Sequence, residues 1–387
     1  MEYNFDKIID RSKTDDIKWN RLSNMYEDDI VPMWVADMDL AVASPIIDKI
    51  KERLETPIFG YASLNDTHRK LVMDYFNNRF NYGIEIKDIS FSTGVVFSIS
   101  ALIQAFTKEN DKIMIMLPTY GPFTKVTLNS SRIPIYTYLK LEGDKYVIDF
   151  EEMEEIVEDC KVLILCNPHN PTGKIFSKEE LIKIAEFAEK HEMLIISDEI
   201  HCDFDFNKKF IPIININEYT KNNTVALTSI TKSFNLAGLK ISFVFIKNEE
   251  LRKKLNQVFG LFGIGEINTF AIEALKAVYT ECTDWMDATI EYIEKNIDYA
   301  LERFENIPEI KTVKPEGTYL LWLDMSGVNV DKESLHQKLL DEAKVFMTPG
   351  NNFGEEFQSY ERLNVGCPKS QLKKAIDRIE EFVIEYR

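Results

Sequence analysis

Five short, almost wholly apolar stretches divide the middle of the chain: residues 113–117, 162–166, 194–197, 225–228 and 241–246. Runs of this kind are typical of strands buried on both faces, as in a parallel sheet covered by helices. A segment with helical periodicity, residues 178–191, lies between two of these runs. Ser177 and Glu180 form a capping-box pattern in front of it, which predicts the start of a helix. The alternation of strands and helices predicts an α/β fold.

Polar residues of unusual kinds follow these apolar runs, at the point where each predicted strand ends. They are Tyr120 after the first run, the loop 167–173 after the second, Asp198 at the end of the third, and Ser229 and Lys232 after the fourth. In open α/β sheets, ligands bind at the carboxyl ends of the strands. The sequence therefore predicts a binding site built from these side chains.

The C-terminal part of the chain has a different pattern. A long helical stretch at residues 284–304 leads to a strand pattern at 317–324, and another helix is expected around 334–343. The final helix is predicted over residues 371–386, with Ser370 as its N-cap. This order of elements indicates a smaller α+β domain.

One or two domains are expected from a chain of 387 residues. No glycine- or serine-rich linker marks a boundary between them. We expect the N-terminal segment to join the C-terminal part. The predicted division is a large domain at residues 46–284 and a small domain at residues 1–45 and 285–387.

Composition narrows the class of protein. With 45% hydrophobic and 28% charged residues, the chain is typical of a globular protein in water. Its net charge of −18 opposes binding to nucleic acid or to an anionic membrane. No apolar run approaches the roughly 18 residues of a membrane helix, and no signal peptide is expected. The five cysteines form no CxxC pair, so we expect neither a metal site nor a disulfide framework, and a cytoplasmic location.

Three residues carry most of the chemical information. Lys232 follows hydroxyl side chains, and its amine could form a Schiff base and then remove a substrate α-proton. Asp198 ends an apolar strand, where a carboxylate needs a partner such as a protonated pyridine nitrogen. Asn170 lies in a turn that would aim its amide at a phenolate oxygen. Singly they suit a surface lysine, a helix cap and a turn; together they predict pyridoxal phosphate (PLP).

A phosphate site is predicted in front of another helix. Gly94, Val95 and Val96 precede a predicted helix at residues 97–106, and the N–H groups at a helix start bind anions. We expect Ser229 to join this site. Tyr120 would stack on the cofactor ring, although a tyrosine at a strand end is more often a packing residue.

Asn170, Asp198 and Lys232 occur in an order that resembles the fold-type I PLP enzymes, the aspartate aminotransferase superfamily. Arg362 matches the superfamily's substrate-carboxylate arginine, a role that suits its two parallel donors; a surface ion pair is the alternative. The resemblance runs from about residue 30 to the end. It implies a large domain whose mostly parallel, seven-stranded sheet is sandwiched by helices, plus a smaller α+β domain.

A closer similarity is to the cystathionine β-lyase (MalY/PatB-like) branch of the C–S lyases. The segments that carry it are residues 32–39, 59–61, 94–96, 120–123, 198–203, 234–239, 315–319 and 362–368. His201 stands where many aminotransferases place a tyrosine beside the phenolate oxygen. Lys240 stands where many place a phosphate-binding arginine. Both departures fit the lyase branch better than a general aminotransferase.

The resemblance also implies partners and further contacts. It implies a homodimer with active sites between the subunits, in which Tyr61 reaches the phosphate of the neighbouring subunit's cofactor. It implies an amino-acid substrate held by Arg362 and Asn170, with Ala36 and Asp37 nearby.

The function implied is α,β-elimination from a cysteine thioether, with cystathionine the leading substrate and a thiol, pyruvate and ammonia as products. An aminotransferase needs the same residues up to removal of the α-proton, so it remains the alternative. A regulatory or interaction protein that keeps the fold without turnover is a third hypothesis, which the complete catalytic set disfavours.

Overall fold

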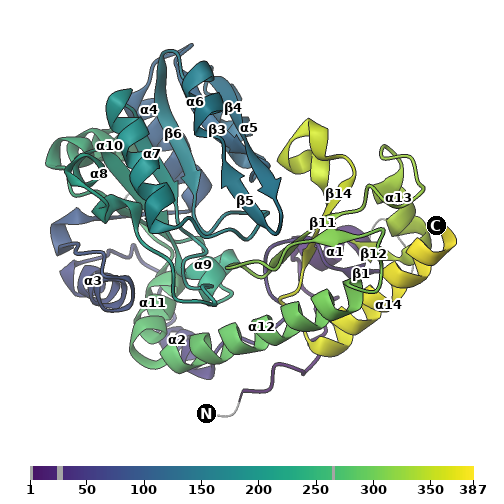
Figure 1. Ribbon diagram of the computed structural model, residues 1–387. Helices are drawn as coiled ribbons and strands as arrows, with labels where there is room; N and C mark the ends of the chain where they lie inside the picture. Colours follow the sequence, from purple (N-terminus) through teal and green to yellow (C-terminus); the bar gives the residue numbers. More distant parts are fainter. Residues whose placement is uncertain (1–2, 24–28, 264–265) are drawn as a thin grey trace.

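A large mixed sheet forms the centre of the structure, a computed structural model that describes residues 3–23, 29–263 and 266–387 (Figure 1). Its eight strands in spatial order are β2 (Ile89–Ser92), β9 (Ser242–Phe245), β8 (Thr224–Thr228), β7 (Leu194–Asp198), β6 (Cys160–Cys166), β3 (Lys112–Leu117), β4 (Ile133–Glu142) and β5 (Lys145–Ile148). The strands β8, β7, β6, β3 and β4 are parallel. The predicted fold class is confirmed, with two corrections.

The first correction is the number of strands, which is eight rather than seven. The chain reverses through Gly143, whose φ of 63° suits a two-residue hairpin turn, and β5 pairs antiparallel with the end of β4. The second correction concerns the run at residues 241–246, which forms β9 but lies antiparallel to β8 and β2. A strand that is apolar on both faces has the same pattern in either direction, so periodicity could not predict its orientation.

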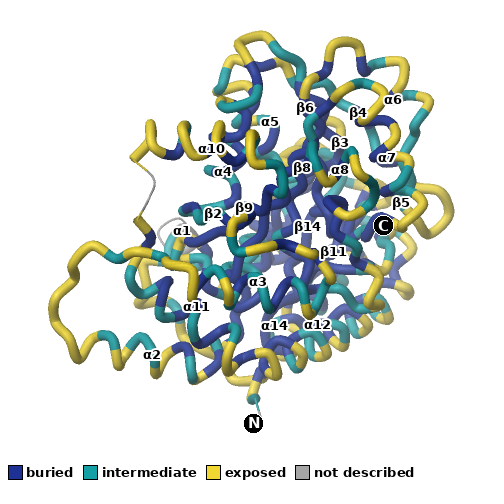
Figure 2. The backbone as a smooth tube through the Cα atoms, turned by 90° about the vertical axis from the view of Figure 1, so that its left-hand side faces the viewer, coloured by how far each residue is buried: buried dark blue, intermediate teal, exposed yellow. Residues whose placement is uncertain are grey.

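Helices cover both faces of this sheet, and the side chains of β3 alternate between the two faces. Ile113 and Ile115 pack into one core cluster with residues of α4 (Val95–Phe106), α5 (Pro122–Asn129) and α10 (Glu249–Leu261). Met114 and Met116 point the other way, into a cluster with α6 (Phe150–Ile156) and α7 (Lys178–Lys190). Figure 2 shows the strands as the buried interior of this lobe. The capping box of Ser177 and Glu180 at the start of α7 is confirmed.

Three further helices pack together beside the β2–β9 end of the sheet: α2 (Ser44–Leu54), α3 (Asp66–Phe80) and α11 (Thr269–Glu281). The shorter turns of the large lobe are η1 (Ile86–Asp88), η2 (Ile213–Asn215), α8 (Glu218–Asn223), α9 (Ile230–Ser233) and η3 (Ala237–Leu239). The segment between α2 and α3 is exposed and stands away from the body of the molecule (Figure 2).

The C-terminal lobe is built on an antiparallel sheet in the order β10 (Lys311–Thr312), β11 (Leu320–Asp324), β14 (Tyr360–Asn364), β13 (Thr348–Pro349). Its helical elements are α12 (Thr283–Phe304), α13 (Leu335–Lys338), η4 (Leu339–Ala343), η5 (Gly350–Phe353), η6 (Glu355–Phe357) and α14 (Lys369–Glu385). The predicted cap of the last helix was wrong. Ser370 lies inside the first turn of α14, and Pro368, with its fixed φ, occupies the cap position.

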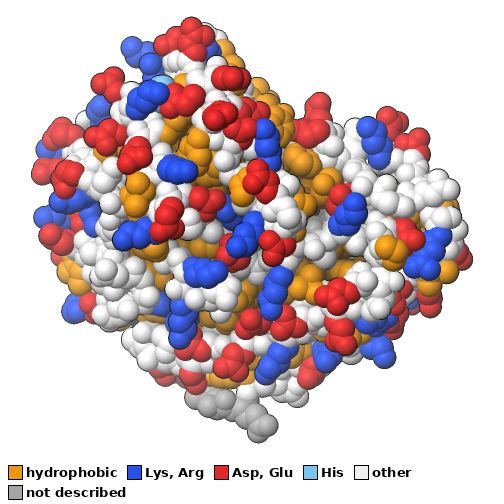
Figure 3. Space-filling view, in the orientation of Figure 1, with side chains coloured by type: hydrophobic (Ala, Val, Ile, Leu, Met, Phe, Trp, Pro, Cys, Tyr) orange, Lys and Arg blue, Asp and Glu red, His pale blue; other side chains and the backbone are white. Residues whose placement is uncertain are grey.

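The N-terminal segment lies against this second lobe. After α1 (Ile17–Ser23), the short strand β1 (Val31–Pro32) pairs in parallel with β12 (Val345–Phe346). This pairing agrees with a small domain made from both ends of the chain, and the proposed limits at residues 46 and 284 stay a prediction. Acidic and basic side chains are interspersed over the face shown in Figure 3. In the ranges that the structure describes, no helix combines the length and apolar character needed to cross a membrane.

Candidate active site

A cavity of about 580 Å³ lies where the carboxyl ends of β3, β6, β7 and β8 meet the loop at residues 33–39 and strand β14. Most of the residues predicted from the sequence line it. They are Ala36, Gly94, Val95, Val96, Tyr120, Asn170, Asp198, His201, Lys232, Lys240 and Arg362. Elements from both lobes therefore build one site.

Lys232 enters the cavity from α9, the short helix that follows β8. Ser229 caps this helix by accepting a hydrogen bond from the N–H of Thr231. The Lys232 Nζ donates to the carbonyl oxygen of Ala36 at 2.5 Å. Burial lowers the pKa of the amine to about 8, an effect that the charge of Asp37 opposes. An amine with this pKa is neutral in part of the molecules near neutral pH and is able to act as nucleophile or base.

Asp198 ends β7 beneath the same cavity. Its Oδ1 accepts a hydrogen bond from the N–H of Ile200 at 3.1 Å, and it forms no ion pair within the described ranges. Burial raises the pKa of this carboxyl to about 7, and the charge of Lys232 opposes the shift. A buried carboxylate in this position would be stabilised by a cationic ring nitrogen, which is the group that PLP supplies.

Arg362 projects from β14 and is held by three acceptors. Its Nη1 donates to Oδ1 of Asn170 at 2.9 Å, and its Nη2 donates to the carbonyl of Trp34 at 2.9 Å and to Oγ1 of Thr348 at 3.2 Å. The guanidinium carbon lies 4.9 Å from the ring centre of Phe353. Burial lowers the pKa of Arg362 to about 10, so the group stays charged at neutral pH. Its Nε is buried without a hydrogen-bond partner, as expected of a donor that awaits a carboxylate.

The predicted phosphate site lies at the start of α4. Gly94 is the N-cap residue of this helix, and the first N–H groups of a helix leave donors free for an anion. Lys240, which follows η3, brings a cation to the same cavity. Ser229 does not line the cavity, because its hydroxyl caps α9 and donates to the carbonyl of Ile241 at 2.5 Å. Its contact with phosphate stays a prediction.

Two ring side chains complete the wall. His201 is buried, its Nδ1 has no hydrogen-bond partner, and burial lowers its pKa to about 3. The neutral ring can therefore present one N–H donor to a cofactor oxygen. Tyr120 packs edge-on against Phe123, with ring centres 5.7 Å apart, and faces the cavity.

Two predicted residues lie away from the cavity wall. Asp37 does not line it, and its carboxylate pairs with Arg11 and Lys18 on the far side of the loop. Tyr61 is 93% exposed and contacts nothing in this cavity, so any role there requires a second subunit. Sequence reasoning missed Trp34 and Thr348. A carbonyl acceptor and one threonine carry no pattern of their own that could have singled them out.

The residues that line the cavity fit PLP. An amine, an unpaired buried carboxylate, an amide, a neutral histidine and a helix start with a cation match the groups of that cofactor one by one. The fold and this site define a PLP-dependent enzyme of fold type I. The chain belongs to the family of class I and II aminotransferases, whose model matches residues 23–379.

Comparisons with individual proteins include two solved structures that contain PLP. The chain is 35% identical to cystathionine β-lyase PatB of Bacillus subtilis, covering 97% of this chain and 99% of that protein. A PLP-bound Clostridium difficile protein provisionally classed as an aminotransferase is 41% identical, with a TM-score of 0.95 and coverage of 99% and 100%. Cystalysin from Treponema denticola, which contains PLP, is 29% identical, with a TM-score of 0.96 and full coverage of both chains. PLP is the cofactor of this family, and the chain lies in its C–S lyase branch.

Proposed function

We propose that the protein is a C–S β-lyase that cleaves the Cβ–S bond of cystathionine or a related cysteine thioether. The products are a thiol (homocysteine from cystathionine), pyruvate and ammonia. The observation that carries the proposal is that one cavity holds both the amine of Lys232 and the carboxylate-binding unit of Arg362 and Asn170. His201 and Lys240, which depart from the general aminotransferase pattern, support the lyase branch, as do the names of PatB and its relatives.

The residues divide the work of holding cofactor and substrate. The carboxylate of Asp198 would accept a hydrogen bond from the protonated ring nitrogen, while Asn170 and His201 would donate to the phenolate oxygen. The start of α4 and Lys240 would hold the phosphate, and Tyr120 would cover the ring. When bound, PLP supplies an electron sink for the charge left on Cα after proton removal.

Arg362 would bind the substrate carboxylate and so fix the orientation of the Cα–H bond. The neutral amine of Lys232 would then take the α-proton, a step suited to a base whose pKa burial lowers to about 8. The thiol leaves from Cβ, and the remaining three-carbon unit takes up water to give pyruvate and ammonia. The site thus eliminates the substituent without a second carbonyl substrate.

An aminotransferase is the second candidate, favoured by the family model and by the provisional class of the Clostridium difficile protein. Every role above up to the α-proton is shared. The difference lies in whether the proton returns to the cofactor carbon or the sulfur substituent leaves first. The candidate therefore predicts a strict need for a keto-acid acceptor.

The test is to incubate the PLP-loaded protein with L-cystathionine and no keto acid, and to measure pyruvate and free thiol together. Equal amounts of both over many turnovers are expected. Neither product, with turnover restored by 2-oxoglutarate and an ordinary amino acid, would replace the lyase by an aminotransferase.

The proposal includes a homodimer with shared sites, and a cytoplasmic location. Leu54 at the end of α2 and Ile58 and Phe59 on the segment after it are exposed apolar side chains close to Tyr61 in the sequence, which supports burial of this segment against a second subunit. Five buried free cysteines suit a reducing compartment.

A further inference from the structure

The loop at residues 33–39 fixes the two most important side chains of the site through its backbone. The carbonyl of Trp34 accepts from Arg362, and the carbonyl of Ala36 accepts from Lys232 at 2.5 Å and from the hydroxyl of Tyr319 at 2.9 Å. A shift of this loop would therefore move the acceptors of Lys232 and Arg362 together.

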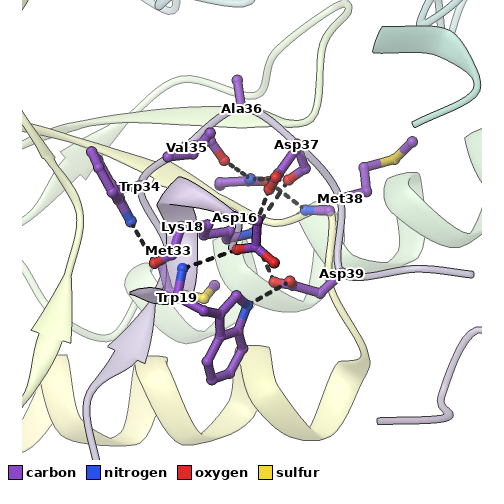
Figure 4. A network of polar contacts seen from close by, with 12 residues as sticks. Asp16, Lys18, Trp19, Met33, Trp34, Val35, Ala36, Asp37, Met38 and Asp39 are labelled. Atoms are coloured by element: carbon purple, nitrogen blue, oxygen red, sulfur yellow. Dashed lines mark hydrogen bonds and ion pairs between the residues drawn. The ribbon is translucent and has the colours of Figure 1, made fainter. Parts of the chain in front are cut away.

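A cluster of charged side chains lies against this loop, and Figure 4 shows Lys18, Asp37 and Asp39 close together within the bend of the loop. The Nζ of Lys18 lies 2.7 Å from Oδ2 of Asp39 and 3.3 Å from Oδ1 of Asp37. Arg11 bridges the same two carboxylates, at 2.6 Å to Asp39 and 2.9 Å to Asp37. The Lys18 Nζ also donates to the backbone carbonyl of Asp37 at 3.2 Å. Arg11 also pairs with Asp16 of its own segment, at 3.1 Å. Two cations from the N-terminal segment thus hold the two carboxylates of the loop.

Two members of this cluster, Lys18 and Asp39, are buried, so their charges depend on their partners. The Lys18 side chain is 1% exposed and the Asp39 side chain is 5% exposed. A buried charge without its partner is strongly disfavoured, so removing one cation would force the carboxylates or their loop to rearrange. Ion pairs inside a protein contribute little net stability, but they can fix one arrangement of the backbone.

We propose that Lys18 and Arg11 are positioning residues of the active site, which hold the loop so that its carbonyls orient Lys232 and Arg362. This inference rests on the proposed roles of Lys232 and Arg362. The side chains of these four residues do not line the cavity, so they reach it through the loop that they hold and through the charge of Asp37.

The electrostatic consequence has a definite sign. The charges of Asp37 and Asp198 favour the protonated form of Lys232, whereas those of Arg362 and Lys240 disfavour it. Of these groups, Asp37 is the one that Lys18 and Arg11 neutralise. Loss of a cation would leave more of the negative charge uncompensated, and the pKa of Lys232 would rise.

The experiment compares Lys18→Met with Arg252→Met, which breaks another buried ion pair, between Arg252 and Asp88 at 2.9 Å, far from the loop. Two readouts are needed. The first is the pH midpoint for capture of PLP by the apoprotein, followed by its visible absorbance. The second is kcat and KM of the loaded enzyme. Thermal unfolding of both variants measures how much stability each loses when a buried ion pair is broken.

We expect the capture midpoint of Lys18→Met to rise by about 0.5–1 pH unit, and its kcat/KM to fall about tenfold below that of Arg252→Met, with KM raised and kcat lowered. A midpoint equal to wild type, with kcat/KM within about twofold of the control, would overturn the proposal and leave a purely structural cluster. If Lys18→Met does not fold, Arg11→Gln replaces it. Arg11 is 17% exposed, and the same two outcomes decide.

The capture midpoint separates this proposal from the lyase assignment. A wild-type enzyme that releases no thiol would end the assignment, while a shifted midpoint in Lys18→Met would still support the positioning role. If wild type releases thiol and pyruvate but the midpoint of Lys18→Met is unshifted, the lyase assignment stands and the positioning role is overturned.

Discussion

Arg362 donates a hydrogen bond from Nη1 to the side-chain oxygen of Asn170 at 2.9 Å. The bond joins β14 of the C-terminal lobe to the loop after β6 of the large sheet. Asn170 is the proposed donor to the cofactor oxygen, and Arg362 is the proposed binder of the substrate carboxylate. A substrate that displaces the Arg362 side chain would therefore also displace the amide of Asn170 beside the cofactor. The two binding functions are coupled by this hydrogen bond.

The first prediction concerns the several hydrogen-bond donors of the Arg362 guanidinium group. Arg362→Lys keeps the charge but cannot hold Asn170, Trp34 and a carboxylate together, so KM should rise about 10- to 100-fold. The visible absorbance of bound PLP should stay unchanged. Arg303→Lys is the matched control, because Arg303 pairs with Asp377 and Glu380 outside the cavity. A KM within twofold of the control would remove Arg362 from the substrate site.

The second prediction concerns the charge of Asp198. Asp198→Asn keeps the shape of the side chain but removes the partner of the ring nitrogen. We expect kcat to fall about 10²- to 10³-fold, with smaller changes in KM, because the missing charge acts on the developing negative charge. Steady-state kinetics on PLP-loaded protein make this measurement, and an unchanged kcat would contradict the role.

The third prediction follows from the amine of Lys232, whose pKa burial lowers to about 8. Only the neutral amine attacks an aldehyde, so the rate of PLP capture by the apoprotein should rise with pH through about 8 and level off above it. His201 should add no step between pH 5 and 9, because burial lowers its pKa to about 3. A free lysine derivative, with a pKa near 10.4, is the reference. A protein rate that keeps rising to pH 10 would contradict a lowered pKa.

The lowered pKa of Lys232 also makes the stability of the apoprotein depend on pH. The folded-state pKa of Lys232 is depressed, so the folded apoprotein binds its proton less tightly than the unfolded chain does. The contribution of Lys232 to the free energy of unfolding is therefore fully present above the unfolded pKa near 10.4. This contribution is lost as the pH falls toward the folded pKa of about 8. Lys232→Met should thus stabilise the apoprotein more at pH 7 than at pH 10, in paired denaturant titrations.

The fifth prediction tests the shared site. If Tyr61 acts in the neighbouring subunit, then mixed dimers of Tyr61→Ala and Lys232→Ala contain one site with both residues intact. Mixed dimers purified after coexpression of the two variants should regain about half of the wild-type activity, because each carries one complete site, and the unpurified mixture should regain about a quarter. Mixed dimers as inactive as their parents would place Tyr61 outside the partner's site.

Much of the fold and most of the site could be predicted because they depend on patterns along the chain. Apolar runs marked the parallel strands β3, β6, β7 and β8, but not the parallel strand β4. The polar residues at the ends of these strands, such as Asp198, did meet at one sheet edge. The edge strand β5 was missed because residues 145–148 are partly exposed and have little apolar character. The cap at Ser370 failed because Pro368 starts the helix earlier.

The support around the site could not be predicted, because it depends on contacts between distant parts of the chain. Lys232 donates to the carbonyl of Ala36, which lies 196 positions away in the sequence. Thr348 donates to the carbonyl of Trp34, which lies 314 positions away. Asp37 was expected near the substrate but faces Lys18 and Arg11, since a loop of irregular backbone has no periodicity to set the direction of its side chains.

The most direct test of the account is the fate of the α-proton in Lys232→Ala. The variant is loaded with PLP and given L-cystathionine in D₂O, and NMR follows deuterium at Cα while thiol and pyruvate are assayed. We predict that wild type releases both products, whereas Lys232→Ala neither exchanges the α-proton nor releases thiol. Exchange and thiol release at wild-type rates in Lys232→Ala would contradict its role as the base and with it the site described above.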